Sequence, residues 1–183
     1  MVDVTVASIG LFLVFPILLL ACAAIVLEDG GKPLFLQRRV GRFERIFTIY
    51  KLRTMRVDAC GDRLSPANGS DERVTRVGRF LRRTSVDELP QLVNVVLGDM
   101  SLVGPRPEMQ IILARYEPWQ NLRHLVTPGI TCIWQTTCRS TVPLHRPEAT
   151  ALDVEYIKRA SPLLDGSLLL RTFLSIVFPK GAY

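Results

Sequence analysis

The sequence lacks any paired-cysteine motif. Its four cysteines, Cys22, Cys60, Cys132 and Cys138, contain no C-x-x-C pair and no regular framework. We therefore predict free thiols in a reducing compartment. Cys132, Cys138 and His145 are residue types that bind zinc, but no fourth ligand stands at a suitable spacing, so a zinc site is not expected.

The first part of the chain lacks charge. Residues 4–27 are 24 consecutive positions without a charged side chain, bounded by Asp3 and Glu28. As a helix this run is about 36 Å long, which exceeds the roughly 30 Å hydrocarbon core of a bilayer. The run therefore predicts membrane insertion.

Three membrane topologies are compatible with this run. Residues 19–22 (LLAC) have the form of a lipoprotein signal, but such a signal needs a basic start, and only Asp3 is charged there. A spanning helix would leave the rest of the chain in the cytoplasm, because basic residues follow the run. A re-entrant helix would bend at Pro16, whose ring removes a backbone hydrogen bond, and would return to the same face. Proline also occurs in spanning helices, so the residues leave spanning and re-entrant topologies open.

The overall composition suits one basic, apolar domain. The 183 residues are 48% hydrophobic, with a net charge of +6. This charge favours an anionic partner, such as phosphates, nucleic acid or an acidic membrane face. Because no nucleic-acid recognition motif accompanies the membrane segment, we do not expect nucleic acid as a partner.

Most of the predicted elements are helices. Residues 34–40 and 46–52 predict a β-hairpin, because both runs are rich in β-branched and aromatic residues. Residues 73–83 predict an amphipathic helix whose repeated arginines face headgroups or another anion. Residues 58–72 and 100–107 predict loops, and residues 130–135 predict a strand. Further helices are predicted over residues 85–97 (ended by Gly98), 108–116, 118–126, 147–159 and 162–178, the last capped by Ser161 and packed or lying at the membrane interface.

Residues 85–88 (SVDE) allow two interpretations. In the first, Ser85 caps a helix and Glu88 reaches back to it as a capping box, although Pro90 complicates such a helix. In the second, Asp87 and Glu88 are adjacent carboxylates that follow Arg82 and Arg83. Arginine forks match phosphate geometry, and Mg²⁺ binds one or two carboxylates together with phosphate oxygens. One carboxylate as nucleophile and its neighbour as metal ligand would form a phosphoryl-transfer site.

Several long motifs resemble those of the bacterial sugar transferases, the monotopic phosphoglycosyl transferases. Residues 47–55 (FTIYKLRTM) resemble the family element F-T-I-Y-K-F-R-S-M. Residues 82–92 (RRTSVDELPQL) and 98–108 (GDMSLVGPRPE) are similar to its central signature nearly letter for letter. Residues 127–131 (TPGIT), Trp134, Gln135 and Arg139 resemble a later element, so the resemblance covers almost the whole chain.

The resemblance implies a specific reaction. Asp87 would attack the β-phosphate of a UDP-sugar, expel UMP and hold the phospho-sugar covalently, and polyprenyl (undecaprenyl) phosphate would then accept it in a ping-pong cycle. Glu88 would bind Mg²⁺. The implied phosphate, nucleotide or substrate contacts are Lys51, Arg53, Arg82, Arg106, Gln135 and Arg139. The family's membrane segment is re-entrant around a Ser-Pro pair, which favours a bend at Pro16.

The chain also departs from the family pattern. Phe15 stands where serine usually precedes the proline. Cys132 and Cys138 replace expected glycines, and their side chains are expected to narrow the nucleotide pocket or alter the loop that bears Arg139.

The combined prediction is an α-rich α+β membrane enzyme for the first membrane step of glycan assembly. Residues 1–28 would be a re-entrant helix, and residues 29–183 a catalytic domain with a β-hairpin and amphipathic interface helices. We expect the protein to lie among inner-membrane lipids on the cytoplasmic face of a bacterial plasma membrane. The sequence is compatible with a monomer or an oligomer. The rival interpretation is a non-catalytic, membrane-anchored module whose basic face binds acidic lipids or a partner.

Overall fold

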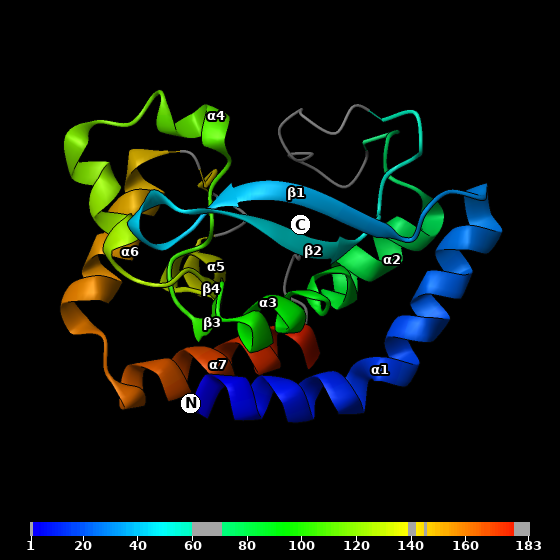
Figure 1. The fold of residues 1–183 in the computed structure, drawn as a ribbon, viewed down its shortest axis with the longest axis horizontal. Coiled ribbons are helices and arrows are strands. Elements are labelled where there is room, and N and C mark those ends of the chain that lie inside the picture. Colours follow the sequence, from blue (N-terminus) through cyan, green and yellow to red (C-terminus); the bar gives the residue numbers. More distant parts are fainter. Residues whose placement is uncertain (1, 60–70, 139–141, 145, 178–183) are drawn as a thin grey trace.

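The computed structural model describes residues 2–59, 71–138, 142–144 and 146–177. Figure 1 shows a short β-hairpin surrounded by helices, with a long bent helix along one edge. The elements in chain order are α1 (Val2–Asp29), β1 (Leu34–Val40), η1 (Arg42–Glu44), β2 (Ile46–Leu52), α2 (Arg76–Thr84), η2 (Val86–Glu88), α3 (Gln91–Leu97), β3 (Ser101–Val103), α4 (Gln110–Leu113), η3 (Pro118–Leu125), β4 (Gly129–Thr131), α5 (Ile133–Thr137), α6 (Pro147–Arg159) and α7 (Pro162–Val177). The η elements are 3₁₀ helices.

Helix α1 is long and apolar enough to cross a membrane, and most of its surface is exposed. Figure 1 shows it running along the lower edge of the molecule and then bending upward. Pro16 lies inside the helix, and it lacks the N–H that would continue the hydrogen-bond ladder, which accounts for a bend.

Both ends of α1 are tied to the same globular body. The Asp3 carboxylate accepts hydrogen bonds from the Ser101 hydroxyl and, at 3.4 Å, from the Leu102 backbone N–H. At the other end, Glu28 accepts from the backbone N–H groups of Arg76 at 2.7 Å and Val77 at 3.1 Å. Both ends of α1 therefore contact the globular body.

The hairpin is confirmed with the predicted bounds, and it packs against α3. Its strands pair antiparallel from Leu34–Leu52 to Val40–Ile46. The Asn94 side chain of α3 binds the β2 backbone, accepting from the N–H of Tyr50 at 3.1 Å and donating to the carbonyl of Thr48 at 2.7 Å. This pairing holds the strand that carries Lys51 against the middle of α3.

The predicted helix over residues 85–97 is wrong, because the chain breaks it into two pieces. Ser85 adopts a left-handed conformation with φ of 56°, and η2 and α3 follow on either side of Pro90. Proline has no N–H to donate to a continuous helix. Gly98 ends α3 as predicted, with φ of 84°.

Two predictions beyond residue 98 were also wrong. The loop predicted over residues 100–107 contains β3, and the strand predicted over residues 130–135 ends at Thr131, where α5 soon follows. Strands β3 and β4 pair in parallel, with Ser101 opposite Gly129. A three-residue strand is too short to show an alternation of apolar and polar residues in the sequence. Its pairing also depends on a segment that is distant in the chain.

Of the remaining predicted helices, α2, α6 and α7 are confirmed, whereas the two predicted between residues 108 and 126 differ in length or type. Helix α6 has the predicted bounds, and the Ser161 hydroxyl caps α7 by accepting from the N–H of Leu164 at 3.3 Å. Helix α2 begins at Arg76, later than predicted, because Thr75 caps it. The helix predicted over residues 108–116 shortens to α4, and that over 118–126 is the 3₁₀ helix η3.

A glycine in α2 allows this helix to approach the segment after β2. A Cβ atom built on Gly78 would lie 2.1 Å from the Thr54 carbonyl oxygen, whereas one on Gly166 in α7 would have no neighbour within 4 Å. We expect Gly78→Ala to lower the free energy of unfolding by about 1–3 kcal/mol, because the helix must shift.

The matched control is Gly166→Ala, which should leave stability unchanged or raise it by up to about 1 kcal/mol through helix propensity. Thermal unfolding of both variants in the same detergent measures the difference. Equal midpoints for the two variants would contradict the close approach at Gly78.

Candidate active site

The backbone turn at Ser85 positions two adjacent carboxylates. Ser85 makes no side-chain cap bond, and the Glu88 side chain bonds to Lys51 and Arg106 instead of reaching back to Ser85. The capping-box interpretation is therefore wrong. Asp87 is half-buried and Glu88 is buried, and the two lie on η2 between α2 and α3.

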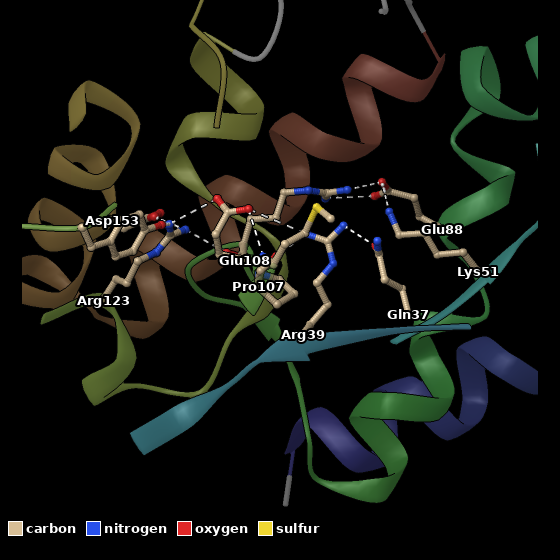
Figure 2. Close-up of polar contacts among 11 residues, drawn as sticks. Gln37, Arg39, Lys51, Glu88, Pro107, Glu108, Arg123 and Asp153 are labelled. Atoms are coloured by element: carbon tan, nitrogen blue, oxygen red, sulfur yellow. Dashed lines mark hydrogen bonds and ion pairs between the residues drawn. The ribbon is translucent and has the colours of Figure 1, made fainter. Parts of the chain in front are cut away.

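Glu88 is the centre of a buried ionic cluster (Figure 2). Its side chain is 7% exposed, and Lys51 Nζ donates to Oε1 at 3.2 Å. Arg106 binds the same carboxylate with two nitrogens: Nη1 donates to Oε2 at 3.2 Å, and Nη2 donates to Oε1. Arg106 Nη1 also donates to Gln135 Oε1 at 2.9 Å. The structure thus joins Lys51, Glu88, Arg106 and Gln135, which are far apart in the sequence.

The electrostatics of the cluster reflect burial among opposite charges. Burial lowers the pKa of Lys51 to about 8, although the Glu88 carboxylate opposes this effect. Burial also disfavours the charged form of Arg106, but the Glu88 carboxylate outweighs it and raises the pKa of Arg106. The Asp87 charge raises the pKa of both cations, which places Asp87 within electrostatic reach of each.

Two other predicted site residues, Arg53 and Arg82, contact different partners, and a third is not described. Arg53 Nη1 donates to Asp29 at the end of α1, at 2.9 Å. Arg82 Nε donates to the Thr54 hydroxyl at 2.8 Å. Arg139 lies outside the residues that the structure describes.

The predictions from sequence missed a second ionic group beside the cluster. The backbone of residues 106–108 lies between Arg39, which reaches Glu108 at 3.8 Å, and Arg123, which reaches Asp153 at 2.7 Å (Figure 2). Burial raises the pKa of Asp153 to about 6, although the Arg123 cation opposes this effect. A signal was present in the sequence: Asp153 shares one face of helix 147–159 with the buried Ala149 and Tyr156.

The oxygen donors suit a metal that is shared with a substrate. Among the described residues, no group of three or more His, Cys, Asp or Glu side chains could hold a metal ion. Asp87 and Glu88 together offer adjacent carboxylates, which is the donor set that Mg²⁺ uses when phosphate oxygens and water complete its octahedron. The residues therefore fit a magnesium ion bound with phosphate, and they do not fit a metal held by protein alone.

Comparison with known proteins identifies the family. The family described as bacterial sugar transferase matches residues 1–179. The chain belongs to this family. The family prediction made from the sequence motifs is therefore confirmed.

Curated members of the bacterial sugar transferase family are similar along nearly the whole chain. A UDP-glucose:undecaprenyl-phosphate glucose-1-phosphate transferase of Caulobacter vibrioides is 43% identical, over 99% of this chain and 70% of its own length. The galactosyl transferase CpsE of Streptococcus agalactiae is 40% identical over 98% of this chain and 42% of its own length. An N-acetylgalactosaminephosphotransferase of Aeromonas hydrophila, which acts with UDP-N-acetylgalactosamine and undecaprenyl phosphate by its name, is 37% identical over 98% of this chain and 44% of its length. The chain thus spans less than half the length of two of these relatives.

The cysteines that replace family glycines pack in an apolar group beside the ionic cluster, and Cys132 lies within electrostatic reach of Arg106. Cys132 is buried with Trp134 and Ala149, and Cys138 packs against the same group. Burial raises the pKa of Cys132 to about 12, so its thiol is neutral. Within the described residues, the Cys132 side chain therefore fills the core between α5 and α6.

A pH dependence of stability follows from His124, which neighbours Arg123. Burial and then the Arg123 cation lower the pKa of His124 from 6.5 to about 4. Between these two values the unfolded chain binds more protons than the folded one, so the free energy of unfolding falls as the pH falls from 6.5 to 4.

We expect His124→Gln to remove this part of the pH dependence. Chemical denaturation of both proteins between pH 4 and 7 measures it as a difference, in which contributions from groups present in both proteins, such as Asp153, cancel. Parallel stability curves for wild type and variant would show that His124 keeps its ordinary pKa.

Proposed function

We propose that this bacterial sugar transferase moves a sugar 1-phosphate from a UDP-sugar to undecaprenyl phosphate and releases UMP. The observation that carries the proposal is the buried cluster in which Lys51 and Arg106 hold Glu88 next to Asp87. Relatives named for this activity are similar over 99% of the chain. Their names contain different sugars, so the proposal specifies a UDP-sugar and not a particular one.

The proposed reaction has two phosphoryl transfers at one carboxylate. An Asp87 oxygen attacks the β-phosphorus of the donor, the bond from that phosphorus to the bridging oxygen breaks, and UMP leaves with the electron pair. The phospho-sugar is then joined to Asp87 as an acyl phosphate. A phosphate oxygen of undecaprenyl phosphate attacks the same phosphorus and frees the Asp87 carboxylate. One covalent intermediate thus serves two substrates in turn.

Lys51 and Arg106 supply the positive charge that these steps require. Charge builds on the phosphoryl oxygens and on the leaving phosphate, and fixed cations in a buried site stabilise it strongly. Both cations are oriented by Glu88 before any substrate arrives, so little reorganisation is needed when the donor binds. Arg53, Arg82, Gln135 and Arg139 are proposed as further phosphate, nucleotide or substrate contacts.

Glu88 is the proposed ligand of Mg²⁺. When bound, the ion would neutralise charge on the donor pyrophosphate. Glu88 Oε1 accepts from both Lys51 and Arg106, whereas Oε2 accepts from Arg106 alone of these two cations, so we propose that the ion binds through Oε2.

We further propose that α1 is re-entrant, and that residues 29–183 form the catalytic domain on the cytoplasmic face of the inner membrane. In support, Asp3 and Glu28 bind the same globular body at opposite ends of the helix. Exposed apolar side chains on α7, including Leu163, Leu170 and Phe173, suit a helix in the membrane interface. On α2, Phe80 and three arginines are exposed in a similar way: Arg76, Arg79 and Arg83.

A non-catalytic membrane anchor remains the alternative that the experiments should exclude. Such a module has no need for a cation-lined carboxylate pair, and it would bind acidic liposomes whatever residue stands at position 87. Buried ion pairs contribute little to stability compared with apolar packing. The Glu88 cluster therefore favours catalysis over anchoring.

Asp87→Asn should abolish UMP release, because the amide is not a nucleophile. The assay combines purified protein, a panel of UDP-sugars, undecaprenyl phosphate and Mg²⁺. Mass spectrometry of wild-type protein with donor alone should find one phospho-sugar on Asp87. Chelation of the metal should also stop turnover.

Asp58→Asn is the matched control, because its carboxylate is 82% exposed and pairs only loosely with Arg56, at 3.6 Å. It should retain wild-type turnover. Full activity of Asp87→Asn with an active donor would remove Asp87 from the nucleophile role.

The topology proposal predicts that both ends of α1 are on one side of the membrane. In a background with the native cysteines replaced by serine, Val2→Cys and Lys32→Cys are each exposed in the structure. A membrane-impermeant maleimide should label both from the cytoplasmic side in inverted vesicles. Labelling of Val2→Cys only from the opposite side would establish a spanning helix instead.

A further inference from the structure

The four residues from Pro105 to Glu108 have every backbone carbonyl held by a different partner. The Gly129 N–H donates to the Pro105 carbonyl at 2.9 Å, and the Val40 N–H donates to the Glu108 carbonyl at 2.9 Å. Between them, Arg123 Nη2 donates to the Arg106 carbonyl at 2.8 Å and Arg39 Nη1 donates to the Pro107 carbonyl at 3.2 Å. The buried Arg123 and the half-buried Arg39, and not regular secondary structure, therefore hold the backbone on either side of the Arg106–Pro107 bond.

Arg123 is the more deeply buried of these two cations. Its side chain is 1% exposed, and it pairs with Asp153, also 1% exposed, at 2.7 Å. The same guanidinium donates to the Tyr116 hydroxyl and lies 3.7 Å from Glu108. One planar group thus links α6, η3 and the segment before α4.

This arrangement is costly if its only role is stability. Removing two charges from water carries a desolvation penalty that a buried ion pair often fails to recover. Arginine has five N–H donors in a rigid fork. Here the Arg123 guanidinium forms an ion pair with Asp153 and donates hydrogen bonds to a hydroxyl and a backbone carbonyl. The carbonyl belongs to Arg106, whose own guanidinium binds Glu88.

The geometry assigns a role to this contact. We propose that Arg123, held by Asp153, is a positioning residue for phosphoryl transfer: it fixes the Arg106 carbonyl and so directs the Arg106 guanidinium to Glu88. The proposal rests on the function proposed above, since it acts through Arg106. Pro105 and Pro107 restrict the backbone on both sides of Arg106, so a change at its carbonyl is passed to its side chain.

Arg123→Lys tests the proposal, because lysine keeps the charge and loses the fork. We expect kcat for UMP release to fall about 10- to 100-fold, the cost of a small misplacement at a reacting centre. KM for the donor should change less than about threefold, because Arg106 is bound to Glu88 before the donor arrives. Arg106→Lys should change the same parameter in the same direction.

The decisive measurement is the double variant. If Arg123 acts through Arg106, Arg123→Lys should have no further effect in the Arg106→Lys background. A double variant whose kcat falls by the product of the two single effects would overturn the proposal. Arg159→Lys is the matched control, because Arg159 makes an exposed pair with Glu155 on α6, and it should leave kcat and the unfolding midpoint unchanged.

Two further measurements keep the test decisive. If Arg123→Lys fails to fold in detergent, Tyr116→Phe replaces it in the same cycle, since it removes one acceptor of Arg123 and no charge. NMR of the Arg106 guanidinium, assigned by its loss in Arg106→Lys, should show protected signals that weaken in Arg123→Lys and persist in Arg159→Lys. If the Arg106 NMR signals are unchanged in Arg123→Lys, the positioning role of Arg123 is refuted, whatever the turnover rate of that variant. If the wild-type protein releases no UMP, only the proposed function is refuted.

Discussion

The two-nitrogen ion pair between Arg106 and Glu88 is the interaction on which the site depends. A buried carboxylate without a partner would be protonated or would expel the segment that carries it. Here Arg106 and Lys51 are the partners of the buried Glu88 carboxylate. The pair also joins η2 to the segment before α4, so the carboxylates and the cations are held in one place by the same contacts.

The ion pair and the apolar helix α1 are connected through a short path in the structure. Carboxylates at both ends of α1 bind the body, through Ser101 at one end and the start of α2 at the other. Ser101 opens β3, and β3 leads within a few residues to Arg106. An apolar helix and the cluster are therefore linked through one short strand. That link suits the proposed acceptor, which has a charged head and a hydrocarbon tail.

Neighbouring segments determine how rigid the site is. The hairpin contributes Lys51 and Arg39 from different strands, and α6 contributes Asp153 through Arg123. None of these groups is near Glu88 in the sequence. A buried network of this kind specifies one arrangement of its members, because any other arrangement leaves a charge unpaired. The energetic demand of the cluster therefore selects the conformation of the segment that carries Arg106.

Local residue patterns by themselves determined the long apolar helix, the hairpin with its bounds, helix α6 and the cap of α7, because each depends on periodicity or on a neighbouring residue. The motifs also pointed to Asp87, Glu88, Lys51 and Arg106. Only the tertiary structure decided the break at Ser85, the pairing of β3 with β4 and the burial of Arg123 with Asp153. These features depend on partners distant in the chain: a left-handed serine or a buried ion pair is stable only when the surrounding fold supplies its contacts.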